Sequence, residues 1–341
     1  MSKKVAINGF GRIGRLFLRE SIGRSDFEVV AVNDLGDLEN LAYLLKYDTV
    51  YGVFEGDIKS DKDKGELVVN GKVIKVLQVK DPTQLPWKDL GIDVAIEATG
   101  LFESFEGAKA HISAGAKRAV ITAPAKDAEG EGRTILIGVN DEDLSKCQVS
   151  SNGSCTTNSI AAVMKVLSLN PGIVKASLST VHAYTATQSI VDGPVRGGKD
   201  FRRGRAAAQN ISPSTTGAAI AVTRGLPDLA GKFDGMAMRV PVAAGSLSDI
   251  TFLAKRETSA EEVNGILETA SKDPKYGGVF KVTRDQLVSS DILGSRFGGI
   301  VDLGFTKVVD GDLVKVLCWY DNEAGYVATL IAHIAKAISF L

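Results

Sequence analysis

The sequence predicts two domains, an α/β domain with a largely parallel sheet followed by an α+β domain with a mixed or antiparallel sheet. The first hundred residues alternate short β-branched runs with helical stretches, which is typical of a βαβ opening. From about residue 152 the pattern changes to a long helical segment followed by alternating strands. The length of 341 residues exceeds the size at which one hydrophobic core keeps growing.

Short β-branched runs mark the strands of the first domain. We expect strands at residues 5–8, 29–32, 94–97, 119–121 and 135–137, with a first helix over residues 15–21. Parallel strands joined by crossover helices are the economical arrangement for such an alternation. We assign residues 1–154 to this domain. The C-terminal segment 319–341, with an amphipathic helix over 323–341, is expected to pack back on it and complete it.

The second domain is expected over residues 155–318. It opens with a helix over residues 155–169, and strand-like runs follow at 176–182, 235–240 and 247–255. This pattern favours an antiparallel or mixed sheet with one face covered by helices. The Gly- and Arg-rich segment 193–205 predicts a long surface loop.

The composition is that of an ordinary globular protein. Hydrophobic residues make up 44% and charged residues 24%, and the formal net charge is -1. A chain so near neutrality has no overall field to attract nucleic acid or anionic lipid, so an anionic ligand must be bound by a local cluster of basic groups. We therefore expect no nucleic-acid or membrane partner.

The N-terminal sequence, the absence of a long apolar run and the cysteines indicate a cytoplasmic protein with free thiols. The opening Met1-Ser2-Lys3-Lys4 lacks the pattern of a secretory signal, and no apolar run has the length of a membrane span. Cys147, Cys155 and Cys318 are odd in number and have no paired spacing, which argues against a disulfide framework and a zinc cluster. We expect no metal site.

A glycine-rich segment predicts a dinucleotide site. Gly9, Gly11 and Gly14 form G-x-G-x-x-G after an apolar strand and at the start of a helix, where glycines permit a tight turn and close approach of a pyrophosphate. Asp34 follows Gly14 by twenty positions at the end of the next strand. Its carboxylate would accept hydrogen bonds from ribose hydroxyls and repel a 2′-phosphate, which favours NAD. Alternatively, Asp34 only caps the following turn, and NADP would then be used.

Cys155 is the expected nucleophile. It stands where a Gly-containing turn meets the first turn of a helix, and the backbone amides there favour a thiolate and could stabilise an oxyanion. A buried structural cysteine is the alternative, and we assign Cys147 and Cys318 to it. Among the three histidines, His182 closes a strand and precedes a polar loop, so it is the expected base. His111 and His333 lie in predicted helices and are interpreted as surface or packing residues.

These residue types indicate aldehyde oxidation. Attack of the Cys155 thiolate on an aldehyde gives a hemithioacetal, and His182 removes its hydroxyl proton as hydride leaves for a nicotinamide. The product is a thioester, which a second nucleophile, water or phosphate, can cleave. A serine would hold the acyl group at a lower transfer potential.

Several long segments resemble those of phosphorylating glyceraldehyde-3-phosphate dehydrogenases, in the same order and over the whole chain. The matching segments are residues 6–15, 44–48, 151–158, 182–188, 206–211 and 319–323. The resemblance implies a Rossmann-type NAD-binding domain and a catalytic domain. It also implies oxidation of D-glyceraldehyde 3-phosphate with NAD and inorganic phosphate to 1,3-bisphosphoglycerate and NADH, and a homotetramer acting in glycolysis or gluconeogenesis.

The same resemblance implies the roles of further residues. Thr185, Thr187 and Arg239 would bind the substrate phosphate, and Ser154, Thr156, Thr216 and Gly217 the inorganic phosphate, with Arg202 between the two. The residues alone do not distinguish among Arg196, Arg202, Arg203 and Arg205. For the cofactor, the resemblance implies the fingerprint glycines together with Arg12, Ile13, Asp34, Thr99, Gly100, Thr122 and Asn322.

This chain departs from the family pattern at three positions. Ser159 stands where many members have a second cysteine, Gly153 where alanine is usual, and Ala324 where an aromatic residue is usual. We expect Ser159 to preclude an intramolecular disulfide with Cys155 on oxidation, and Ala324 to loosen the packing of the nicotinamide.

Two rival functions remain open at this point. One is an erythrose-4-phosphate dehydrogenase, which uses the same cysteine and histidine but releases the acyl group to water. The segment 185–187 and the paired phosphate residues favour the phosphorylating reaction. The other is a non-catalytic binding protein on the same fold, whose sequence mark would be loss of Cys155 or His182.

Overall fold

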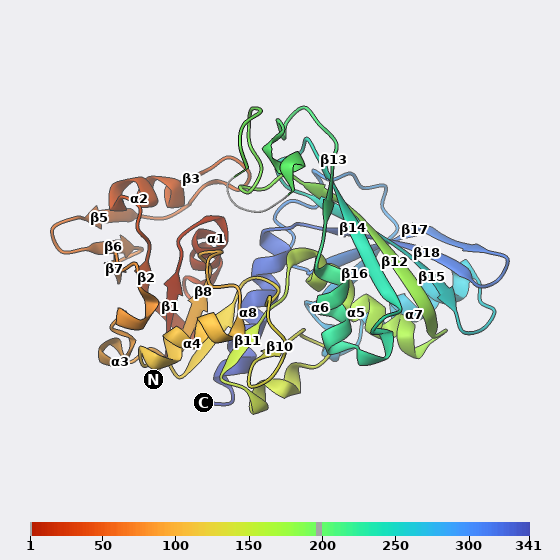
Figure 1. Cartoon of the computed structure of the whole chain (residues 1–341), viewed down its shortest axis with the longest axis horizontal. Coiled ribbons are helices and arrows are strands. Elements are labelled where there is room, and N and C mark those ends of the chain that lie inside the picture. The colour runs from red at the N-terminus through yellow and green to blue at the C-terminus, as the bar shows by residue number, and fades with distance from the viewer. Residues whose placement is uncertain (1, 196–199) are drawn as a thin grey trace. The chain divides into compact units, whose positions relative to one another are not determined.

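The computed structural model describes residues 2–195 and 200–341, and these divide into two compact units (Figure 1). The first unit comprises residues 2–135, 140–153 and 330–341, and the second comprises residues 136–139, 154–195 and 200–329. Each unit is built around a sheet. Within the described residues, no helix combines the length and the apolar character that crossing a bilayer requires.

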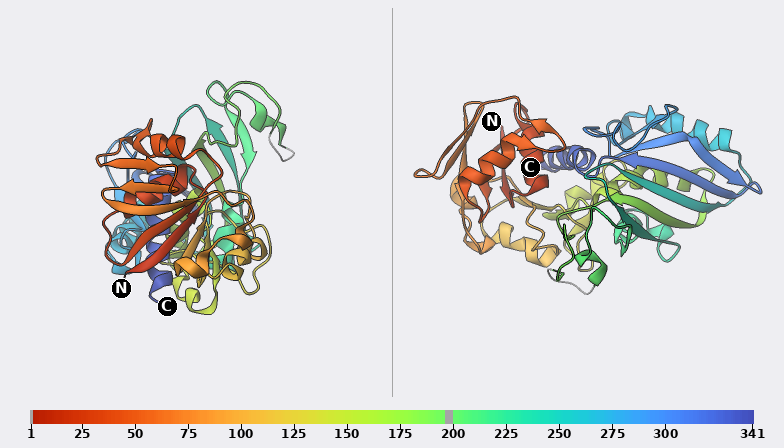
Figure 2. Two further views of the ribbon diagram at one scale, coloured as in Figure 1. Left: turned by 90° about the vertical axis from the view of Figure 1, so that its left-hand side faces the viewer. Right: turned by 90° about the horizontal axis from the view of Figure 1, so that it is seen from above.

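The first unit contains a doubly wound sheet in the order β10-β11-β9-β8-β1-β2-β7-β6-β5. The pairs from β10 to β7 are parallel, and the pairs β7–β6 and β6–β5 are antiparallel. Its red and orange strands face the viewer in the left view of Figure 2. The strands are β1 (Lys3–Asn8), β2 (Phe27–Asn33), β5 (Ile58–Asp61), β6 (Glu66–Val69), β7 (Lys72–Leu77), β8 (Val94–Glu97), β9 (Arg118–Ile121), β10 (Arg133–Thr134) and β11 (Val149–Ser151).

Helices connect the parallel strands of this unit, as the alternating pattern predicts. They are α1 (Arg12–Ser21), α2 (Leu38–Lys46), α3 (Trp87–Leu90) and α4 (Phe105–Ser113), and a small hairpin of β3 (Tyr47–Asp48) and β4 (Gly52–Val53) follows α2. The central strands β8 and β9 are buried along their whole length, which is typical of a parallel sheet covered on both faces.

The expected elements of the first domain are confirmed with one exception. Strands lie over the predicted runs 5–8, 29–32, 94–97 and 119–121, and a helix covers 15–21. The prediction of a strand at 135–137 is wrong, because β10 ends at Thr134. Ile135 and Leu136 are fully buried, and the Ile135 amide still donates to Ser151 O at 2.9 Å, but the chain leaves the sheet there and their apolar character reflects burial.

The second unit contains a mixed sheet in the order β13-β14-β12-β15-β18-β17-β16. The pairs β12–β14 and β16–β17 are parallel and the others antiparallel, which confirms the predicted mixed sheet. Burial alternates strictly along β15, so one face of the sheet is covered. The strands are β12 (Ile173–Ala183), β13 (Ser212–Thr215), β14 (Phe233–Val240), β15 (Ser246–Ala254), β16 (Phe280–Thr283), β17 (Gly299–Val309) and β18 (Leu313–Tyr320).

Three helices pack on the covered face and form the core with it. They are α5 (Cys155–Leu169), α6 (Ala218–Gly225) and α7 (Ala260–Ser271), and residues of all three join one apolar cluster with β12, β15, β17 and β18. Helix α5 has the bounds that the sequence predicts. Helix α8 (Ala324–Ile338) begins in the second unit, and the chain re-enters the first unit along it from Leu330.

His333 lies inside the first unit and not on its surface. The imidazole is fully buried, with Nε2 2.8 Å from Ser150 Oγ and Nδ1 3.0 Å from Asn152 Oδ1. These contacts join α8 to β11 and to the segment that leads into α5. Burial, with a smaller contribution from the charge of Arg118, lowers the pKa of His333 to about 3.

This depressed pKa predicts a loss of stability in mild acid. Below the ordinary value of 6.5 the unfolded chain binds a proton that the folded chain excludes, so the stabilisation present above pH 6.5 is lost as pH falls toward 3. The loss is about 1.4 kcal/mol per pH unit over that window. We expect His333→Gln to unfold at a lower temperature at pH 7 but with a shallower dependence on pH between 6 and 4. Equal slopes of the thermal midpoints would contradict the assignment.

Candidate active site

Cys155 is the first residue of α5, and the start of this helix is tightly specified. Ser154 is the N-cap: its Oγ accepts from Thr157 N at 3.1 Å, and Thr157 Oγ1 accepts from Ser154 N at 3.2 Å. Gly153, just before, has φ of +65°, a left-handed conformation in which an alanine would be strained. The departure from the family pattern at this position therefore suits the backbone found here.

His182 lies next to the sulfur. Its Nε2 is 3.3 Å from Cys155 Sγ, so the structure brings together the predicted nucleophile and the predicted base. The imidazole is buried near the end of β12, and the parallel pairing of β12 with β14 places Arg239 opposite it. Arg239 Nη1 lies 2.6 Å from His182 Nδ1 and donates to Ala183 O at 3.1 Å.

The Nδ1 atom of His182 has two competing partners. Ala183 O, at 2.7 Å, can only accept, so it favours a proton on Nδ1 and leaves Nε2 as a base toward the sulfur. The Arg239 guanidinium can only donate, so it favours the opposite tautomer. Any ligand that draws Arg239 away would therefore leave Nε2 as the basic nitrogen.

Burial sets the charge of the pair in the absence of ligand. It raises the pKa of the Cys155 thiol, against the smaller opposing effects of the Arg239 charge and of hydrogen bonds from Thr156 and the Cys155 amide. Burial and the charge of Arg239 lower the pKa of His182 to about 3. The amides of the helix start favour a thiolate, as expected, but burial outweighs them and favours the neutral forms of both groups.

A buried chain of hydroxyls supports the first turn of α5. Thr156 Oγ1 lies 2.8 Å from Tyr320 OH, which lies 2.7 Å from Thr180 Oγ1. The Tyr320 ring also meets the His182 ring edge-on, with centroids 5.9 Å apart. Sequence reasoning did not assign a role to Tyr320 or Thr180. The proximity of Tyr320 to Asn322 in the segment 319–323 is the one sequence signal that could have indicated the first.

The loop after β12 holds the residues expected to bind the substrate phosphate. Thr185 Oγ1 and Thr187 Oγ1 lie 3.0 Å apart, and Arg203 Nη1 donates to Thr187 at 3.2 Å. Arg202 instead forms an ion pair with Asp200, with Nε 2.7 Å from Oδ1. Arg203 is thus a cation at this rim that the sequence alone could not single out. Arg196 lies outside the described residues.

The residues expected to bind inorganic phosphate lie at the N-terminal ends of two helices. Ser154 caps α5, and Gly217 is the N-cap of α6 without a side-chain cap. Thr216 Oγ1 accepts from Ala218 N at 3.2 Å. Helix N-termini present amide N–H groups and the positive end of the dipole, which suits anions.

Asn322 has one end of its amide fixed. Its Oδ1 accepts from Gly245 N at 3.0 Å and from Ser246 Oγ at 3.1 Å. Because a backbone N–H can only donate, the orientation of the amide is set, and its NH₂ group is left to donate elsewhere. Within the described residues this NH₂ group has no protein partner.

The glycine fingerprint in the first unit has the shape that a dinucleotide requires. Gly9 has φ of +96°, and a Cβ there would lie 2.5 Å from the backbone of Ala98 and Thr99. A Cβ on Gly14 would lie 2.3 Å from Gly9 O, so α1 packs tightly on the turn, whereas a Cβ on Gly11 would meet nothing within 4 Å. Gly11 is also the N-cap of α1 and places no side chain on its first-turn amides. A pyrophosphate can therefore approach them.

The other expected cofactor residues lie at the carboxyl ends of neighbouring strands in the same unit. Asp34 follows β2, and its carboxylate accepts from Phe10 N at 2.7 Å and Gly36 N at 2.8 Å. It therefore caps the turn and still has acceptor capacity for ribose hydroxyls. Thr99 and Gly100 follow β8, and Thr122 follows β9. The Arg12 side chain pairs with Asp48 at 3.1 Å, and Ile13 lies in the first turn of α1.

The two other departures from the family pattern are accommodated locally. Ser159 is buried in α5, and its Oγ donates to Thr156 O at 2.8 Å and lies 3.1 Å from Ser248 Oγ. Ala324 is buried at the start of α8, where its amide donates to Asp321 Oδ1 at 2.9 Å. Cys147 and Cys318 are buried, and burial raises the pKa of both thiols, as expected of structural cysteines.

Comparison with known proteins agrees with this geometry. The family model described as glyceraldehyde 3-phosphate dehydrogenase, NAD binding domain, matches residues 3–105, and the one described as glyceraldehyde 3-phosphate dehydrogenase, C-terminal domain, matches residues 154–322. A glyceraldehyde-3-phosphate dehydrogenase of Streptomyces coelicolor is 48% identical over 334 residues, which cover 97% of each chain. That of Clostridium acetobutylicum is 47% identical over 336 residues, again 97% of each chain. The chain therefore belongs to the glyceraldehyde-3-phosphate dehydrogenase family and is an NAD-dependent dehydrogenase.

Proposed function

We propose that this chain oxidises D-glyceraldehyde 3-phosphate with NAD and inorganic phosphate to 1,3-bisphosphoglycerate and NADH, with Cys155 as nucleophile and His182 as base. The observation that carries the proposal is the 3.3 Å contact between Cys155 Sγ and His182 Nε2. The same pair would serve any aldehyde, so the phosphate-binding residues supply the substrate class.

The thiol proton moves to His182 Nε2 as the sulfur bonds to the aldehyde carbon. Because burial favours the neutral forms of both groups, this transfer accompanies attack. The backbone amides at the start of α5 stabilise the oxygen that gains charge. His182 returns the proton to that oxygen to form the hemithioacetal, and then removes it again during oxidation. Bound NAD supplies the acceptor for the hydride that leaves the carbon.

Oxidation leaves an acyl group on Cys155 as a thioester. An oxygen of inorganic phosphate attacks the thioester carbon, the C–S bond breaks and the sulfur leaves as a thiolate. The proton on His182 returns to the sulfur. The acyl phosphate is the product, so atoms and charge balance without a further reactant.

Two groups of residues are proposed to hold the two phosphates. Arg239, Thr185 and Thr187 bind the substrate phosphate, and Arg202 lies between the two sites. Ser154, Thr156, Thr216 and Gly217 bind inorganic phosphate. Hydroxyls, guanidinium forks and helix-start amides are the donors that phosphate oxygens require. Drawing Arg239 onto the substrate phosphate would also leave Ala183 O as the sole partner of His182 Nδ1, and so favour the basic tautomer.

The proposed cofactor residues are the fingerprint glycines with Arg12 and Ile13 for the pyrophosphate, Asp34 for the adenosine ribose, and Thr99, Gly100 and Thr122 at the ends of β8 and β9. The free NH₂ group of Asn322 would donate to the nicotinamide carboxamide. Residues 1–154 with 319–341 would form the NAD domain and 155–318 the catalytic domain. A homotetramer in the cytoplasm completes the proposal.

The three thiols should differ sharply in reactivity. Burial raises the pKa of all three thiols, but Cys155 is partly exposed and contacts a base, whereas Cys147 and Cys318 are buried. We expect iodoacetamide at pH 7 to modify Cys155 first, and His182→Asn to slow this about tenfold because the proton acceptor is lost. Peptide mass spectrometry identifies the modified residue, and unfolded protein, in which all three react, is the control. Earlier labelling of Cys147 or Cys318 would refute the assignment.

The rate of NADH formation at saturating aldehyde should require inorganic phosphate. His182→Asn should lower kcat by about 10²–10⁴-fold, because the general base is removed while phosphate binding is kept. Absorbance of NADH with and without phosphate is the measurement. A rate that is independent of phosphate would move the assignment to a hydrolytic dehydrogenase of the erythrose-4-phosphate type. Absence of turnover with both NAD and NADP would favour the non-catalytic alternative.

Cofactor choice should depend on Asp34. The carboxylate repels a 2′-phosphate, so we expect a lower KM for NAD than for NADP. Asp34→Asn keeps an acceptor for Phe10 N and removes the charge, and should raise the NADP-to-NAD ratio of kcat/KM by about tenfold. A wild-type KM that is lower for NADP would overturn the proposal.

A further inference from the structure

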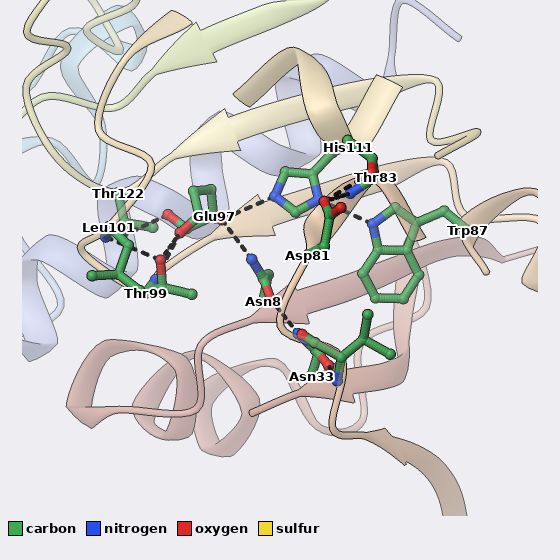
Figure 3. Close-up of polar contacts among 11 residues, drawn as sticks. Asn8, Asn33, Asp81, Thr83, Trp87, Glu97, Thr99, Leu101, His111 and Thr122 are labelled. Carbon is green, nitrogen blue, oxygen red and sulfur yellow. Dashed lines mark hydrogen bonds and ion pairs between the residues drawn. The ribbon is translucent and has the colours of Figure 1, made fainter. Parts of the chain in front are cut away.

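We propose that Glu97 is a positioning residue for NAD binding: its buried carboxylate holds the turn after β1 and the turn after β8 in the geometry that receives the dinucleotide. The inference rests on the proposed cofactor residues. Glu97 is the last residue of β8 and is 2% exposed. It lies between Asn8, directly before Gly9, and Thr99, directly before Gly100 (Figure 3).

Within the described residues, four donors reach the two oxygens of this carboxylate. Oε2 accepts from Asn8 Nδ2 at 2.6 Å and from His111 Nε2 at 2.9 Å. Oε1 accepts from Thr99 N at 2.9 Å and from Thr99 Oγ1. A buried carboxylate is tolerated only when its lone pairs are used in this way.

The orientation of the Asn8 amide is fixed by Asn33, which is itself fixed by the backbone of Val79. Asn33 donates through Nδ2 to Val79 O at 2.9 Å and accepts through Oδ1 from Val79 N at 2.8 Å, so the backbone of Val79 determines which end of the Asn33 amide is which. Asn33 Nδ2 also donates to Asn8 Oδ1 at 2.7 Å. The Nδ2 group of Asn8 must therefore face Glu97.

The direction of the bond from His111 is fixed in the same manner. Trp87 Nε1 can only donate, and it lies 3.1 Å from His111 Nδ1. Nδ1 therefore accepts, so the neutral ring carries its proton on Nε2 and donates it to Glu97. His111 is fully buried, and its interpretation as a packing residue misses this role. Both sides of Oε2 thus meet groups that can only donate.

The carboxylate determines the shape of the cofactor-binding turns. Thr99 Oγ1, held by Glu97, accepts from Leu101 N at 3.1 Å and so orders residues 99–101. The backbone of Glu97 also binds the next turn, because its carbonyl accepts from Thr122 N and Thr122 Oγ1, each at 3.0 Å. Gly9 lies against the backbone of Ala98 and Thr99, which leaves no room for a Cβ atom. A displaced Thr99 would therefore disturb both turns.

Glu97→Gln tests this role with almost no change in volume. The glutamine NH₂ group can take the position of Oε2, where it meets the donors of Asn8 and His111, or the position of Oε1, where it meets Thr99 N and Thr99 Oγ1. The second orientation is the less costly, because the Thr99 hydroxyl can rotate and accept from the NH₂ group. The Thr99 amide is then left without an acceptor. We expect the Kd for NAD, measured by calorimetry on the apoenzyme, to rise about tenfold or more. Hydrogen exchange of the Thr99 and Leu101 amides should accelerate.

Asp93→Asn is the matched control at the opposite end of the same strand. Asp93 directly precedes β8 and is also buried, with Oδ2 accepting from Lys4 N at 2.8 Å and Oδ1 pairing with Lys117 at 2.7 Å. A role in stability alone predicts that both variants melt earlier and keep their affinity for NAD. Positioning predicts that Asp93→Asn stays within about twofold of the wild-type Kd. Both variants should retain the wild-type rate of Cys155 alkylation without NAD.

A second pair of variants acts through His111, which is not among the proposed cofactor residues. His111→Gln keeps a donor near the position of the imidazole Nε2, and His111→Leu removes it. We expect the leucine variant to bind NAD several-fold more weakly and the glutamine variant to stay within about twofold of the wild type. This pair replaces the Glu97 variant if Glu97→Gln does not fold.

The outcomes separate the two proposals. Wild-type Kd values for Glu97→Gln and His111→Leu would overturn the role of Glu97 while leaving the dehydrogenase assignment intact. An equal loss of affinity in Asp93→Asn would also overturn it, because the effect would then not be specific to the end of β8 that carries Glu97. Absence of NAD binding by the wild-type protein would overturn the proposed cofactor site and this inference together.

Discussion

The contact between Cys155 and His182 depends on a buried series of hydroxyl groups, Thr156–Tyr320–Thr180. This series joins the first turn of α5 to β18 and β12 through contacts of 2.8 and 2.7 Å. Thr156 follows the nucleophile by one residue, and Thr180 precedes the base by two. This series of hydroxyls thus holds the two segments that carry the sulfur and the imidazole, which lie 3.3 Å apart. Close packing transmits small shifts, so loss of the Tyr320 hydroxyl would alter this distance without removing either reactive group.

Burial is the main influence on the pKa values of Cys155 and His182. The same desolvation raises the pKa of the thiol and lowers that of the imidazole, so both effects favour the neutral partners over an ion pair. The charge of Arg239 acts differently on the two groups, because it stabilises a thiolate and destabilises an imidazolium. Substrate that engages Arg239 would therefore change the proton balance of the pair as well as the position of the aldehyde. Under the proposed assignment, one guanidinium would therefore couple substrate binding to activation of the pair.

Sequence patterns predicted the helices and strands well and the side-chain contacts between them poorly. Helix α5 and strand β8 have the predicted bounds, because a capped run with apolar residues at helical spacing and a short β-branched run carry their signals locally. The apolar run at 135–137 indicated burial but not the backbone conformation. The contacts of His333 with Asn152, of His111 with Glu97 and of Arg203 with Thr187 join residues that are distant in sequence, and no local pattern encodes them. The sequence patterns predicted which residues carry chemistry, and the tertiary structure shows which residues contact them.

Fixed donors and acceptors explain why so many polar side chains are buried around the two sets of functional residues. A hydroxyl or amide that could turn either way would leave its neighbour in two orientations, whereas a backbone N–H or an indole N–H allows only one. Val79 and Trp87 fix the groups around Glu97, and Gly245 N fixes the amide of Asn322. His182 Nδ1 is the exception, since an acceptor and a donor compete for it. The turns beside Glu97 are thus held in one arrangement, whereas the tautomer of His182 would change if a ligand drew Arg239 away.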